Sequence, residues 1–203
     1  MKDKWWAFLI ILALDLYFLW TTVKNCKRRR LIRDTPITPI AQLRAGLAAI
    51  RGKTVAAAQA ILSPLSQTPC VYYQFTLEEK RTSRNVSSSG QSSSRTTWHT
   101  IINDRSCAEC AITDPTGSIT IDLTRAEIEL DPSAKGSTGL FSSAPPEVEA
   151  MLKERYGKST KGLLFNRPMR YTESVLPVGK DVYAIGSVQD TPGGKLTLTK
   201  GPH

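Results

Sequence analysis

The chain has 203 residues, four cysteines and a formal net charge of +9. Four cysteines are too few for a scaffold built on disulfides, so the composition indicates a reducing compartment. Residues 1–33 hold eight Lys or Arg residues and two Asp, which gives this segment +6 and leaves +3 for the remaining 170 residues. This distribution argues against a basic nucleic-acid-binding domain.

Residues 5–23 (WWAFLIILALDLYFLWTTV) form a long apolar run with a single charge. As a helix rising about 1.5 Å per residue, the run is long enough to span the hydrocarbon core of a bilayer. Its aromatic residues lie toward the ends, where amphipathic rings favour the interface; they are Trp5, Trp6, Tyr17 and Trp20. Because the run ends in threonines and arginines without an A-x-A pattern, an uncleaved transmembrane anchor is favoured over a secretory signal peptide.

A basic stem follows the apolar run and consists of Lys24, Lys27, Arg28, Arg29, Arg30 and Arg33. The positive-inside bias predicts a single-pass membrane protein with its N-terminus outside and everything after residue 24 on the cytoplasmic side. The same cations attract anionic lipid headgroups, so lipid is an expected partner. Asp15, near the middle of the run, is costly in lipid; it either contacts a partner helix or is tolerated by a very apolar segment.

Residues 34–203 are enough for one domain with a core of its own. Thr38 and Pro39 suit the start of a short helix. Its apolar face is formed by Ile40, Leu43 and Leu47. A strand is expected over 47–58, with Gly52 as the candidate position for a bulge.

The segment SPLSQTPCVYYQFTLEEK begins with a Pro-rich turn (Pro64, Pro69) and continues as a strand over 70–80. Val71, Tyr73, Phe75 and Leu77 occupy one face of this strand, and Cys70, Tyr72, Gln74 and Thr76 the other. Residues 81–97 are rich in serine and lack a hydrophobic pattern. They are expected to form a disordered, basic hairpin loop, because nothing in them offsets the entropy of ordering.

Strand signals resume at Trp98, and Asp114–Gly117 (DPTG) forms a turn between two further strands. An irregular insertion over 131–168 encloses a helix near 146–156. A strand over 182–188, a Gly-rich turn and a strand ending near Lys200 complete the chain. Together these elements predict an N-terminal transmembrane helix and a mainly-β domain, a small antiparallel OB-like barrel with one or two short helices.

Several short motifs occur in a consistent order: G-x-x-x-A from Gly52 to Ala56, SPLSQTPCVYY, the Trp98 hairpin, the D-x-T-G turn and RYTESVLPVGKDVYAIGSV. Following a membrane helix, this order resembles the GIDE domain, also called BAM ("beside a membrane"), over about residues 45–200. The motif residues are Pro64, Pro69, Cys70, Tyr72, Tyr73, Trp98, Asp114, Gly117, Tyr171, Glu173, Gly179 and Gly186. The resemblance implies a family of mitochondrial E3 ubiquitin ligases, whose activity belongs to a C-terminal RING after a second membrane helix.

The chain departs from that pattern in its zinc ligands. A RING needs two tetrahedral zinc sites with four Cys or His ligands each. The chain has four Cys and two His in total, and it reaches His203 without a second hydrophobic span. The resemblance therefore implies the membrane-proximal barrel in a short form, without the RING.

Cys70, His99, Cys107 and Cys110 would provide one Cys₃His zinc site, and C-x-x-C is a zinc-binding spacing. Positions i and i+3 of a strand point to opposite faces, however, so buried cysteines are the favoured interpretation; a redox C-x-x-C is a further alternative. No cofactor is expected.

No catalytic residue is assigned. The G-x-S-x-G, Walker A and H-E-x-x-H motifs do not occur. A Ser–His–Asp site would depend on His99, with Asp104 or Asp114 as the orienting acid. Glu173 is expected to pair with Arg170 or with a cation on a neighbouring strand.

We therefore interpret the chain as a membrane-anchored binding or scaffolding module at the cytoplasmic face, with a protein partner bound through the hairpin loop and strand edges. One alternative is an enzyme that transfers a modifier or catalyses hydrolysis. Another is an OB-like nucleic-acid binder, in which Tyr72, Tyr73 and Trp98 would supply stacking rings. Adjacent positions such as Tyr72 and Tyr73 cannot share a strand face, and nucleic acid is not expected as a partner.

Overall fold

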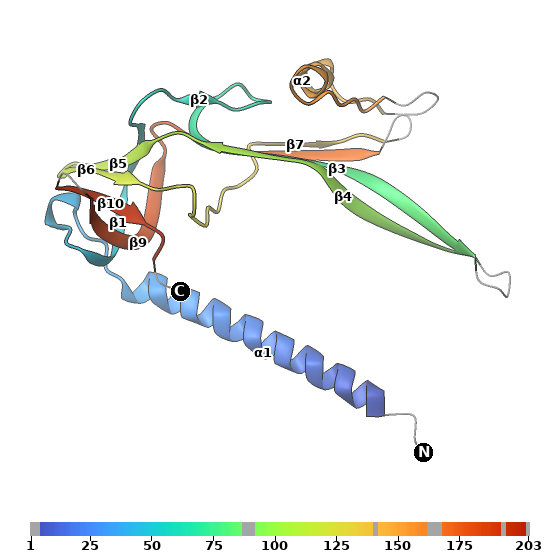
Figure 1. Cartoon of the computed structure of the whole chain (residues 1–203), viewed down its shortest axis with the longest axis horizontal. Coiled ribbons are helices and arrows are strands. Elements are labelled where there is room, and N and C mark those ends of the chain that lie inside the picture. The colour runs from blue at the N-terminus through green and yellow to red at the C-terminus, as the bar shows by residue number, and fades with distance from the viewer. Residues whose placement is uncertain (1–4, 87–91, 140–141, 162–167, 192–193, 202–203) are drawn as a thin grey trace.

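The computed structural model describes residues 5–86, 92–139, 142–161, 168–191 and 194–201. The elements are α1 (Trp5–Asp34), η1 (Ile40–Gln42), β1 (Gly46–Ala56), β2 (Ile61–Leu62), β3 (Pro69–Val86), β4 (Ser92–Cys107), β5 (Cys110–Asp114), β6 (Gly117–Ile121), β7 (Ala134–Ser137), α2 (Pro146–Tyr156), β8 (Met169–Pro177), β9 (Asp181–Thr191) and β10 (Lys195–Thr199). Figure 1 shows α1 leaving a β domain as a separate helix, with the β3–β4 hairpin extending away from the barrel on the same side.

Five strands close into a barrel in the order β1-β5-β6-β10-β9. β6 and β10 run parallel, with Thr197 opposite Thr120, and the other neighbours are antiparallel. Counted along the chain, the barrel strands stand in the order 1-2-3-5-4, the Greek-key order of the OB-fold. Because successive side chains of a strand point to opposite faces, Ile50, Ile112 and Val188 point inward and form the barrel core. The prediction of a mainly-β domain with a small barrel is confirmed.

A second sheet is built from two excursions of the chain out of the barrel. The first runs between β1 and β5 and contributes β2, β3 and β4, and the second runs between β6 and β9 and contributes β7, α2 and β8. Strands β2, β3, β4, β7 and β8 together form what we call the inserted sheet, with β3 at its centre between β4 and β8.

One face of the inserted sheet is apolar and is covered by α2. The period-two pattern of β3 places Phe75 and Leu77 on this face, where they pack with Val148 and Leu152 of α2 and with Met169 of β8. Full burial of one such side chain contributes about 1.5–3 kcal/mol to folding. α2 occupies the range predicted for it, and it ends at Gly157, whose φ of 61° is the left-handed conformation that glycine favours at a helix C-terminus.

α1 is a helix as predicted, but it continues through the basic stem to Asp34. The large apolar side chains from Leu9 to Val23 are exposed, Leu9 by 65% and Trp20 by 62%, and Asp15 is exposed as well. Among the residues that the structure describes, no helix is at once long enough and apolar enough to cross a membrane. The transmembrane span in the fold prediction therefore has no support from the structure.

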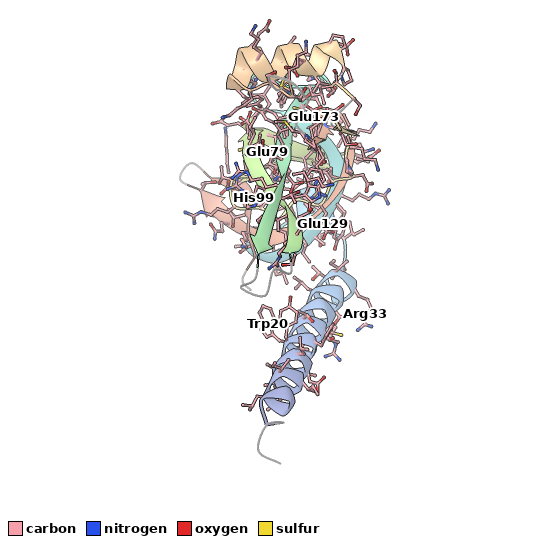
Figure 2. The ribbon with its side chains drawn as sticks, turned by 90° about the vertical axis from the view of Figure 1, so that its right-hand side faces the viewer. Trp20, Arg33, Glu79, His99, Glu129 and Glu173 are labelled. Carbon is pink, nitrogen blue, oxygen red and sulfur yellow. The ribbon has the colours of Figure 1, made fainter. Side chains whose placement is uncertain are left out.

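The side chains of the stem are described in part. Arg30 and Arg33 are exposed, and those of Lys24, Lys27, Arg28 and Arg29 lie outside the described residues. Figure 2 shows Trp20 and Arg33 on α1, apart from the β domain that carries Glu79, His99 and Glu173.

Three predicted segments differ in the structure. The short helix expected from Pro39 is a single 3-10 turn, and Leu47 lies exposed on β1. β1 pairs with β9 without a register shift at Gly52. The segment 81–97 was expected to be a disordered loop, whereas β3 continues to Val86 and β4 begins at Ser92. The part of that prediction that falls on 87–91 lies outside the described residues.

Candidate interaction surface on the inserted sheet

Glu173 is a buried carboxylate that fixes the Pro-rich turn before β3. Its side chain is fully buried and accepts the backbone N–H of Leu65 at 2.7 Å and that of Ser66 at 3.0 Å. The predicted pairing with Arg170 is wrong, because the two residues are three positions apart on β8 and point to opposite faces. Glu173 thus has a structural role in joining β8 to the turn at 63–68.

Other motif residues hold the barrel strands and their connections in place. A Cβ on Gly186 would lie 2.3 Å from the carbonyl oxygen of Thr199, so glycine is needed where β9 and β10 approach. Gly179 has a φ of 81° and donates its N–H to the carbonyl of the buried Thr54 at 2.7 Å. Asp114 accepts the N–H groups of Gly117 at 2.9 Å and of Ile40 at 2.9 Å.

Most of the motif residues therefore have a structural role. The buried members of the motif are Pro64, Cys70, Tyr73, Tyr171, Glu173 and Gly186. Its exposed or half-exposed members are Pro69, Tyr72, Trp98, Asp114, Gly117 and Gly179. Of these, Trp98 is a large aromatic side chain that remains 37% exposed.

The structure does not assemble the candidate zinc site. Cys70 is the second residue of β3, whereas His99 lies opposite Glu79 on the β3–β4 hairpin. Within the described residues, no group of three or more His, Cys, Asp or Glu side chains is placed to hold a metal ion. Burial raises the pKa of Cys70, and burial with the neighbouring Cys107 raises the pKa of Cys110 to about 12, so both are protonated thiols at neutral pH.

The acids considered for a Ser–His–Asp site are engaged elsewhere. Asp104 accepts hydrogen bonds from Tyr156 at 2.7 Å, from Arg155 at 3.2 Å and from Tyr73 at 3.3 Å. Tyr156 also stacks on Phe75, with ring centroids 5.6 Å apart. Burial, together with the hydrogen bond to Asp104, raises the pKa of Tyr156. This cluster, which we call the Asp104 cluster, fastens the end of α2 to the inserted sheet.

The face of the inserted sheet opposite α2 is polar. Cross-strand pairing places Gln74 next to Arg105 and Ser174, and Thr76 next to Asn103 and Thr172. We call this the open face; its side chains are Tyr72, Gln74, Thr76 and Glu78 of β3, Trp98, Thr100, Asn103 and Arg105 of β4, and Arg170, Thr172 and Ser174 of β8. All of them are exposed or half-buried, so this face is open to a partner.

Three residues of the open face form a preorganised group that we call the Trp98 platform. Arg170 donates from Nε to Glu78 at 2.5 Å and from an Nη to Glu78 at 3.1 Å, and its guanidinium carbon lies 4.5 Å from the centroid of the Trp98 ring. The hydrogen bonds from Arg170 lower the pKa of Glu78 and raise the pKa of Arg170. Tryptophan and arginine are enriched at the energetic centres of protein interfaces.

Beyond the Trp98 platform the sheet narrows to a two-stranded ribbon. β8 last pairs with β3 at Met169 opposite Glu79, while β3 and β4 remain paired out to Val86 opposite Ser92. We call residues 80–86 and 92–98 the hairpin arm (Figure 1). In the described part of the chain, no strand pairs with the outer edge of β4, and such an edge is a template for an additional strand.

The barrel face used by nucleic-acid-binding OB-folds has a different character here. It is carried by the second and third barrel strands, β5 and β6. Their outward side chains are Ala111, Thr113, Ser118 and Thr120, which offer neither a stacking ring nor a cation. Tyr72 and Tyr73 lie on opposite faces of β3, and Tyr73 is buried. On the open face, by contrast, Trp98 is an exposed ring and Arg105 and Arg170 are exposed cations.

Comparison with known proteins gives a family match. A family model described as "GIDE: E3 Ubiquitin ligase" matches residues 78–203, which is more than half of the chain. The matched range starts at Glu78 and contains the rest of the Trp98 platform. No curated protein and no solved structure matches the chain.

Proposed function

This chain belongs to the GIDE family, and we propose that it is a membrane-anchored binding module that holds a protein partner against its inserted sheet. The observation that carries the proposal is the Trp98 platform at the base of a hairpin arm with an unpaired strand edge. A partner that pairs with β4 would gain main-chain hydrogen bonds, and Trp98 and Arg170 would supply side-chain recognition.

Binding is supported over catalysis by how the polar side chains are used. Asp104 and Glu173 each accept at least two hydrogen bonds within the domain, and these bonds hold α2 and the Pro-rich turn in place. The four Cys and two His of the chain are too few for the two zinc sites of a RING.

A link to ubiquitin transfer rests on the family description alone, and it is the second candidate function. If the chain were itself a ligase, purified chain mixed with ubiquitin, activating enzyme and conjugating enzymes would modify itself. The binding proposal predicts no such product beyond that formed without the chain.

The membrane anchor in this proposal is α1. Its exposed apolar side chains from Leu9 to Val23 form a surface of the kind that marks a membrane or protein contact. We place the N-terminus outside, the stem against anionic headgroups and the β domain on the cytoplasmic side, following the charge bias around α1. Asp15 would face a partner helix.

The test is capture of partners by crosslinking from native membranes that contain the full chain, with two variants compared. Trp98→Ala removes the ring of the platform. Leu62→Ala, on β2 of the same sheet, is the matched control, because Leu62 is an exposed large apolar residue away from the platform. A discrete partner retained by Leu62→Ala and lost by Trp98→Ala supports the proposal. Equal capture by both variants, or no partner above background, contradicts it.

A further inference from the structure

The exposed apolar side chains of the β domain are unevenly distributed. Among the described residues after α1, those that are large and exposed are Ile37, Leu47, Val55, Leu62, Trp98, Val178 and Tyr183. Leu47 and Val55 point outward from β1, because Ile50 and Thr54 of the same strand point inward. Tyr183 points outward from β9, the neighbouring barrel strand. Four of the seven thus lie on or beside one outer face of the barrel.

This face lies where α1 joins the domain. The hydroxyl of Tyr183 is 3.5 Å from the carbonyl oxygen of Ile32, near the end of α1. Ile37 bridges to Ala49 of β1, and Thr38 donates its N–H to the carbonyl of Ala49 at 2.8 Å. Figure 1 accordingly shows the end of α1 beside β1 and β9, and β2 on the far side of the domain.

Exposed apolar and basic side chains lie on both sides of the junction between α1 and the barrel. Ile32 is 45% exposed on α1, Leu47 46% on β1 and Tyr183 41% on β9. The exposed Arg51 lies opposite Tyr183 in the register, and the exposed Lys53 lies opposite Asp181. Arg33 pairs with Asp34 at 2.9 Å at the end of α1. Long basic side chains next to a tyrosine and aliphatic groups suit the boundary between lipid headgroups and acyl chains.

We propose that the outer face formed by Ile37, Leu47, Arg51, Lys53 and Tyr183, which we call the lipid face, rests in the headgroup layer of an anionic membrane. This inference depends on the proposed anchoring through α1. The face is continuous with the end of α1, and its cations are attracted to anionic headgroups over short distances. Contact at the lipid face would fix the orientation of the barrel and so present the open face on one side only.

The experiment places a fluorescent label on either side of the domain. The full chain carries Cys26→Ser and Cys107→Ser, because these are the cysteines that are not fully buried. Leu47→Cys or Leu62→Cys then supplies one labelling position each. Leu62 is the matched control, since it is also an exposed leucine (53%) and lies on β2. Each labelled chain is mixed with vesicles of phosphatidylcholine and phosphatidylglycerol, floated, and exposed to iodide.

The inference predicts that both chains float, that the label at 47 loses most of its quenching by iodide and shifts its emission to the blue, and that the label at 62 stays quenched. If both chains float and both labels are quenched equally, the proposed membrane contact of the lipid face is wrong, whereas the proposed anchoring through α1 is supported. If neither chain floats, the anchor fails and the lipid face fails with it.

Discussion

The buried carboxylate of Glu173 provides the sharpest test of how the inserted sheet is held. Glu173→Ala removes the acceptor of two backbone N–H groups, at Leu65 and Ser66, and leaves both donors in a site from which the side chain had excluded water. A hydrogen bond to a charged group contributes about 1.5–3 kcal/mol to stability. Two such bonds give about 3–6 kcal/mol, a large share of the roughly 5–15 kcal/mol typical of a folded domain.

This loss is measurable by thermal unfolding of the full chain in detergent, followed by circular dichroism. For a chain of this size, 1 kcal/mol corresponds to about 2–4 °C, so Glu173→Ala is expected to lower Tm by roughly 6 °C or more. Glu154→Gln, at an exposed carboxylate on α2, is the control and should leave Tm unchanged. Hydrogen exchange at 63–68 should accelerate in Glu173→Ala. A Tm equal to that of the control, with 63–68 still protected, would refute the assigned role of Glu173.

Two further predictions concern the platform and the barrel. Because Arg170 lowers the pKa of Glu78, the pair contributes stability above the ordinary carboxyl value near 4.5 and loses it as pH falls through the lowered value. The fluorescence of Trp98, obtained by subtracting the spectrum of the Trp98→Phe variant, should therefore change in an acid titration below pH 4.5. The Glu78→Gln variant should not show that change. If Glu78→Gln gives the same titration, Glu78 is not the group responsible. Gly186→Ala would push β9 away from β10 and should lower Tm by several degrees. Gly201→Ala is the control and should leave Tm unchanged, because its Cβ would lie 3.5 Å or more from its neighbours. Equal Tm values for the two variants would contradict the close approach of β9 to β10 at Gly186.

The part of the fold that sequence predicts best is the buried face of β3. Val71, Tyr73, Phe75 and Leu77 alternate with polar residues, and a period of two is a local signal of which side faces a core. The hydrophobic pattern also predicts that the strand ends at residue 80, because the polar segment beyond it shows no such pattern. β3 and β4 nevertheless stay paired there through the backbone, which the side-chain pattern does not report.

The relation between the two β layers could not be predicted from local pattern. β1 pairs with β9 from Gly46 opposite Val188 to Lys53 opposite Asp181, across most of the length of the chain. β8 was not predicted, although Met169, Tyr171, Glu173 and Val175 are all buried on one face of it. The polar Glu173 interrupts the apolar alternation of this strand, and its burial depends on a turn more than a hundred residues earlier.

The candidate site shows the same limit. Trp98 belongs to a sequence motif, but the platform that it forms with Arg170 and Glu78 draws on three different strands, β4, β8 and β3. Pairing of Glu173 with Arg170, one of the two predicted possibilities, is wrong for a reason available in the sequence, since positions 170 and 173 of one strand face opposite ways. The cysteines and His99 were considered as metal ligands on spacing alone, and the strands place His99 far along the hairpin from Cys70.

We propose that a protein partner contacts the inserted sheet at Trp98 when the chain is in its membrane. The most direct measurement places a photo-crosslinking amino acid at position 98, or at position 62 as the control, and irradiates native membranes that contain the full chain. We expect a discrete crosslinked protein from position 98 that position 62 does not yield. The same products from both positions, or none from either, would contradict it.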